Sequence, residues 1–173
     1  MDKRKITIGL FGTCGKSNWR DEFIKAYQME GITYFNPQKD NWQPCNADIE
    51  AEHLVNDDIV LFPITDETYA FGSLAETGFS ILQALKLNER REFIIMVTPD
   101  VKLDESKMST NEILQYTLLR QESFRARALV KAHLKKLNYP NVWVVQSLDN
   151  MLKLSLHLHA IEVLKRATIK YTI

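Results

Sequence analysis

One glutamate in the sequence has the type and the position of a catalytic nucleophile. Glu76 lies in the stretch 69–78 (YAFGSLAETG), which follows an apolar run and opens a helical pattern. We expect Glu76 in the first turn of that helix, where free N–H groups and the helix dipole stabilise a carboxylate. A carboxylate kept ionised in a pocket can attack an anomeric carbon. The alternative is that Glu76 is only a favourable partner for the dipole.

A loop at residues 12–17 (GTCGKS) is the second candidate. Its backbone N–H groups could cradle a nucleoside or a phosphate at the start of a helix. It lacks the full P-loop pattern, because Phe11 stands where the first glycine is required. The thiol of Cys14 could become nucleophilic near a helix start, but we interpret Cys14 as a small residue lining the pocket. The alternative for the whole loop is a plain turn between a strand and a helix.

Aromatic and histidine side chains give weaker signals. Trp42 and Trp19 could each stack on a base, because aromatic faces bind bases without requiring hydrogen bonds; local packing would explain them equally well. His157 and His159 are two residues apart and would point to different faces of a helix, so we expect no shared metal. We predict no metal site and no cofactor.

The elements that must position these residues alternate between strand-like and helical patterns, as is typical of βαβ units around a parallel sheet. We expect strands at 5–11, 32–35, 59–64, 93–97 and 142–145. We expect helices from 18 to about 31, at 47–55, at 73–87, from a capping box at Ser109 and Glu112 to about 137, and at 148–169. The prediction is a single domain over residues 1–173, an α/β fold of the doubly wound, flavodoxin-like kind. It has a five-stranded parallel sheet with helices on both faces and ligands at the carboxyl ends of the strands. The loops 12–17, 36–45, 65–72 and 99–108 lie there.

The composition limits the function further. The 173 residues include 22 basic and 22 acidic side chains, and this neutral balance argues against general nucleic-acid binding. A basic run on the expected long helix is therefore interpreted as a solvated face rather than a nucleic-acid surface; it comprises Arg120, Arg125, Arg127, Lys131, Lys135 and Lys136. We expect no signal peptide and no membrane segment. Two cysteines without metal-ligand spacing indicate a reduced, cytoplasmic protein.

Two stretches together resemble the core motif of nucleoside 2-deoxyribosyltransferases. Residues 55–62 (VNDDIVLF) place Asp58 at the start of an apolar strand, and residues 72–78 (GSLAETG) give a Gly-x-x-x-Glu-x-Gly helix start. Residues 11–20 and 34–37, with Trp42, resemble a bacterial and phage branch of that superfamily. The resemblance covers residues 5 to about 98.

The resemblance implies a double displacement. Glu76 would attack C1′ of a 2′-deoxynucleoside, an acid would protonate the departing base, and a second base or water would resolve the ester. The acid would be Glu50, where relatives often have Asp, and Asp58 is a third catalytic candidate. The candidates for substrate binding are Gly12, Thr13, Cys14, Asn36, Pro37, Trp42, Tyr69 and Gly72.

One departure from the family leaves other functions open. Relatives usually carry Asp or Ser six residues before the nucleophile, and this chain has Ala70. Asp66, Glu67 or Tyr69 could substitute. The alternatives are a non-catalytic nucleotide-sensing module and an effector that degrades an NAD-type nucleotide. The expected partner is a small nucleoside or nucleotide. We also expect a homo-oligomer, because the last helix is apolar around much of its circumference and relatives complete their sites across subunits.

Overall fold

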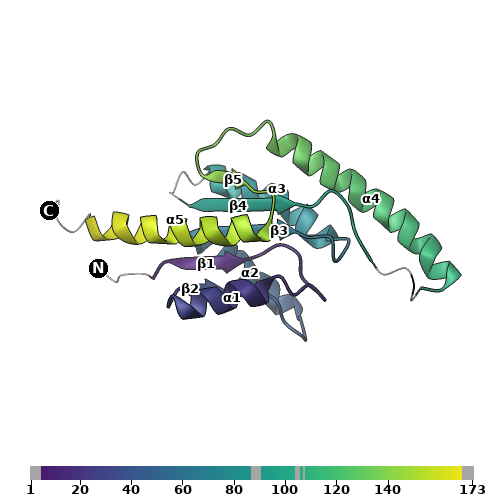
Figure 1. The fold of residues 1–173 in the computed structure, drawn as a ribbon, viewed down its shortest axis with the longest axis horizontal. Helices are drawn as coiled ribbons and strands as arrows, with labels where there is room; N and C mark the ends of the chain where they lie inside the picture. Colours follow the sequence, from purple (N-terminus) through teal and green to yellow (C-terminus); the bar gives the residue numbers. More distant parts are fainter. Residues whose placement is uncertain (1–4, 87–90, 104–105, 107, 169–173) are drawn as a thin grey trace.

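A computed structural model describes residues 5–86, 91–103, 106 and 108–168 (Figure 1). Within them, the strands β1 (Thr7–Leu10), β2 (Thr33–Phe35), β3 (Ile59–Ile64), β4 (Glu92–Val97) and β5 (Val142–Val144) form one sheet. The order is β2-β1-β3-β4-β5, and every pairing is parallel. This is the flavodoxin-like order, so the predicted fold class is confirmed. β3 lies at the centre of the sheet and is buried along its whole length, which explains its unbroken apolar sequence.

Helices cover both faces of this sheet. α1 (Arg20–Met29) and α5 (Leu148–Thr168) lie on one face, and α2 (Pro44–Asn56), α3 (Phe71–Lys86) and α4 (Thr110–Leu134) on the other (Figure 1). The capping box at the start of α4 is confirmed, because Ser109 N donates to Glu112 Oε2 over 2.7 Å. The expected ends of two helices, Leu87 and Ile169, lie outside the described residues. No helix in the described ranges combines the length and the apolar character needed to cross a membrane.

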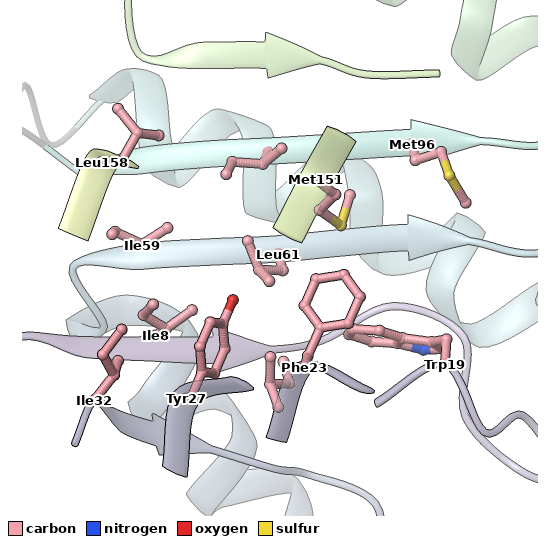
Figure 2. Packing of buried hydrophobic residues seen from close by; sticks show 12 residues of the cluster. Ile8, Trp19, Phe23, Tyr27, Ile32, Ile59, Leu61, Met96, Met151 and Leu158 are labelled. Carbon is pink, nitrogen blue, oxygen red and sulfur yellow. The ribbon is translucent and has the colours of Figure 1, made fainter. Parts of the chain in front are cut away.

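The first core layer joins α1 and α5 to the sheet. Figure 2 shows Phe23 and Tyr27 of α1 lying beside the strands, with Met151 of α5 close to Leu61 of β3. The hydroxyls of Tyr27 and Ser155 are 2.6 Å apart in this buried layer, and this hydrogen bond links the two helices. The second layer packs α2, α3 and α4 against the opposite face of the same strands. The sheet is therefore clamped from both sides, which fixes the strand ends that carry the loops.

Two helices begin earlier than the sequence predicts. α2 begins at Pro44 instead of residue 47, because Gln43 and Asn46 cap each other and Pro44 suits a first helical position. α3 begins at Phe71 instead of residue 73. The backbone of Ala70 has a positive φ of 55°, and its carbonyl already accepts the first helical hydrogen bond, from Leu74 N.

Candidate active site

A cavity of about 530 Å³ lies at the carboxyl edge of the sheet. The loops that follow β1 and β2 form part of its wall, and the first turns of α3 and one turn of α2 form the rest. Of the residues predicted for the site, the cavity brings together Gly12, Cys14, Pro37, Trp42, Glu50, Gly72 and Glu76. The remaining lining residues were not predicted individually, although four of them lie in the predicted loops 12–17 and 36–45; they are Gly15, Gln38, Lys39, Asp40 and Ser73.

Glu76 lies in the second turn of α3, not in the first. It is the sixth residue of a helix that begins at Phe71, so the expected first-turn position was wrong. The helix dipole acts mainly within the first turn, and here other effects dominate. Glu76 as a whole residue is exposed at the mouth of the cavity, but partial desolvation by the surrounding wall raises the pKa of its carboxyl, and the charge of Glu50 raises it further. The helix start therefore does not hold this carboxylate at a low pKa.

Glu50 projects from α2 into the same cavity and is held by Trp42. The indole Nε1 of Trp42 donates to Glu50 Oε1 over 2.7 Å. The Trp42 side chain is 50% exposed, so its ring is accessible to a ligand in the cavity. The two residues come from one loop-and-helix segment, and the hydrogen bond fixes their relative position.

Cys14 lines the cavity as a thiol. The residue is exposed to the cavity, but desolvation by the surrounding wall raises the pKa of the Cys14 thiol, and the positive charge of Arg20 only partly opposes this. The Sγ atom donates to the Gly12 carbonyl over 3.4 Å. These contacts support the interpretation of Cys14 as a lining residue, because a reactive cysteine requires a lowered pKa.

The buried guanidinium of Arg20 holds the loop 12–17 in place. Arg20 is 1% exposed and donates to the carbonyls of Leu10, Phe11 and Thr13 over 2.9, 3.3 and 2.6 Å. Arg20 was not predicted as a functional residue. Its spacing from Phe23 and Tyr27 was the available signal, because positions 20, 23 and 27 fall on one helix face, the face that is buried.

The same loop is fixed to the end of β3. Gly12 has a φ of +85°, and a Cβ placed on it would lie 2.4 Å from the Pro63 carbonyl oxygen, so the close approach requires glycine. Thr13 N donates to that oxygen over 2.9 Å, and Thr65 N donates to Thr13 Oγ1 over 2.9 Å. Thr13 is thus fully buried beneath the cavity and does not line it.

A second buried arginine orders the loop between β3 and α3. Arg127 of α4 is 0% exposed, which corrects the expectation of a solvated basic face at this position. Its guanidinium donates to the carbonyls of Ile64 and Thr68 over 3.3 and 2.9 Å, and to Thr98 Oγ1 over 2.7 Å. Arg127 therefore joins the ends of β3 and β4 to the loop that leads into α3.

Glu67 connects the two loops with each other. Its carboxylate accepts a hydrogen bond from Thr65 Oγ1 over 2.9 Å and another from the Ser17 hydroxyl. Ser17 belongs to the loop after β1, and Thr65 follows β3 directly. This contact holds the two cavity-forming loops together.

Three other predicted residues lie away from the cavity wall. Asp58 precedes β3 at the amino edge of the sheet, where its carboxylate accepts from Thr7 N over 3.0 Å and pairs with Arg166 over 2.5 Å. We therefore leave Asp58 out of the proposed catalytic set. Asn36 accepts from Gln38 N over 3.0 Å and shapes its own loop.

Tyr69 is the third of these residues. Its ring stacks on Phe71 with the centroids 5.6 Å apart and lies beside Tyr116 of α4. This position faces α4, and Tyr69 does not contribute to the cavity wall.

The first half of the chain matches a known family. Residues 5–87 match the family described as nucleoside 2-deoxyribosyltransferase like. No curated protein matches the chain. The matched segment contains every residue that lines the cavity, and it supports the resemblance seen in the sequence.

Proposed function

We propose that the protein transfers or hydrolyses the N-glycosidic bond of a (deoxy)nucleoside or nucleotide, because residues 5–87 match the nucleoside 2-deoxyribosyltransferase-like family. One observation carries the proposal. The carboxylates of Glu50 and Glu76 share a single cavity with the accessible ring of Trp42. Most enzymes that break a glycosidic bond use a pair of carboxyl groups, and an aromatic ring can stack on a nucleobase.

The proposed reaction is a double displacement at C1′. An oxygen of the Glu76 carboxylate forms a bond to C1′ while the C1′–N bond breaks, and its electron pair leaves with the base. A neutral base takes up a proton as it departs, and Glu50 is the proposed donor. A second base or a water molecule then attacks C1′, gives up one proton to Glu50, and releases Glu76 from the ester.

A second candidate function is a nucleotide-sensing module without turnover. Ala70 motivates it, because an apolar side chain stands six residues before Glu76 where relatives usually carry Asp or Ser. In that case Glu76→Ala would leave the affinity for ligand intact, and the native protein would have no activity to lose.

The test is incubation with a 2′-deoxynucleoside, with and without a second free base, followed by chromatography of the products. A new nucleoside indicates a transferase, and free sugar indicates a hydrolase. We expect Glu76→Gln to lower the rate by roughly 10³-fold or more, because it removes the nucleophile.

Glu52→Gln is the matched control for that variant. Glu52 is exposed on α2, bonds to Asn56 and does not line the cavity, so its loss should leave the rate unchanged. The absence of any product from a broad panel of nucleosides and NAD would overturn the enzymatic proposal.

A further inference from the structure

The wall of the cavity is predominantly acidic. Asp40, Glu50 and Glu76 contribute three carboxyl groups, and Lys39 contributes one ammonium group. Arg20 lies behind the wall and adds a second positive charge; its guanidinium donates to three backbone carbonyls and also to Cys14 Sγ and Gln38 Oε1 of the wall. A ligand in this cavity therefore meets more negative than positive charge.

The hydrogen bond between Trp42 and Glu50 places one of these carboxyl groups beside an aromatic ring. An indole N–H can only donate, so Glu50 Oε1 is the acceptor in the 2.7 Å contact. This contact fixes a carboxyl group and a half-exposed indole ring side by side at the cavity, an arrangement that favours a cationic ligand.

We propose that the cavity selects N-glycosides whose base carries a positive charge, such as pyridinium or N-alkylated purinium nucleosides; this proposal rests on the proposed function above. The carboxylates of Asp40 and Glu50 attract the charged ring. The exposed face of Trp42 adds a cation–π contact, since indole is the best aromatic partner for a cation.

A cationic base changes what the two glutamates must do. The Glu76 carboxylate bonds to C1′, and the electron pair of the C1′–N⁺ bond passes to the ring nitrogen, so the base departs neutral. No proton from Glu50 is needed. Water then attacks C1′ and loses one proton to solvent, which regenerates Glu76. The products are the sugar, the neutral base and one proton.

A cationic substrate also assists the nucleophile. Partial desolvation and the charge of Glu50 raise the pKa of Glu76. A positive ring placed beside these carboxylates opposes both effects and favours the ionised, reactive form of Glu76.

The first test compares two probes that differ in charge and by one methyl group. 1-Methylnicotinamide is a cation, nicotinamide is its neutral counterpart, and neither contains a glycosidic bond that could be consumed. Calorimetric titration should show roughly tenfold tighter binding of the cation. Glu50→Gln should reduce this preference below about threefold, while the control Glu52→Gln should preserve it. Equal binding of the two probes by the native protein would overturn the proposal.

The second test separates this inference from the proposed function. Rates are measured for 7-methylguanosine and guanosine, each divided by its uncatalysed rate, and we expect the larger ratio for the cation. An equal or larger ratio for guanosine would overturn the cation preference and leave the glycosidic function standing. Selective binding of 1-methylnicotinamide without turnover of any nucleoside would uphold the preference and overturn the proposed function.

Discussion

Replacing Arg20 with methionine should lower the free energy of unfolding by an amount that can be worked out from its hydrogen bonds. The guanidinium is 1% exposed and donates to three backbone carbonyls at the end of β1 and in the next loop. Methionine keeps much of the aliphatic volume and removes every donor. The carbonyl of Thr13 retains the 2.9 Å hydrogen bond from Trp19 Nε1, so it stays satisfied. The carbonyls of Leu10 and Phe11 lose the donor that Arg20 supplies.

The magnitude follows from those two carbonyl groups. A buried acceptor that loses its partner costs about 1–3 kcal/mol. We therefore expect Arg20→Met to lower the free energy of unfolding by about 2–6 kcal/mol. The free energy of unfolding of Arg20→Lys should lie between those of Arg20→Met and the native protein. An ammonium group keeps the charge, but it lacks the planar set of N–H donors with which a guanidinium reaches several carbonyls.

Urea unfolding followed by circular dichroism measures this difference. Arg125→Met is the matched control, because Arg125 is exposed on α4 and should change stability by no more than about 0.5 kcal/mol. If Arg20→Met costs less than about 1 kcal/mol, the guanidinium does not hold the loop, and the reasoning is refuted.

Two further predictions concern Glu76 and Gly12. Because the folded-state pKa of Glu76 is above its ordinary value of 4.5, its contribution to stability is fully present below about pH 4.5 and is lost as pH rises through the raised pKa. Glu76→Gln, which stays neutral, should thus be more stable than the native protein above that pKa and equally stable below pH 4.5; urea titrations at several pH values test this. Activity should rise with pH through the same pKa, and Glu50→Gln should move the inflection to lower pH in a rate profile. Gly12→Ala should cost about 2–4 kcal/mol, because it combines a φ of +85° with a collision against backbone. Gly15 also has a positive φ, of +78°, but a Cβ placed on it would meet open space. Gly15→Ala should therefore lower the stability measured by thermal unfolding by only about 1 kcal/mol.

Most of the fold could be predicted from the sequence, because the patterns that specify its strands and helices are local. The apolar run of β3 predicts a central buried strand, and the capping pair Ser109 and Glu112 predicts the start of α4. The starts of α2 and α3 were not readable. Gln43 is not a preferred capping residue. Alanine rarely adopts a positive φ, so the residue type at position 70 does not predict the backbone conformation that starts α3.

The site residues could be predicted where a sequence motif and the sheet topology both place them at the same edge of the sheet. Trp42, Glu50 and Glu76 converge because loops and helices that follow parallel strands meet at one edge of the sheet. Asp58 precedes its strand, which puts it at the opposite edge. Arg127 was misjudged because the carbonyls that it binds come from segments 29–63 residues away in the sequence.

The most direct measurement of the central claim is to trap the glycosyl ester. A 2-deoxy-2-fluoro-arabinosyl nucleoside slows breakdown of such an ester, because fluorine disfavours the positively charged transition state. After acid quenching, we expect mass spectrometry to find one fluorosugar per chain, mapped to the peptide that contains Glu76, and none on Glu76→Gln. An adduct on Glu50, or steady turnover of the nucleoside with no adduct at any time, would contradict the claim that Glu76 is the nucleophile.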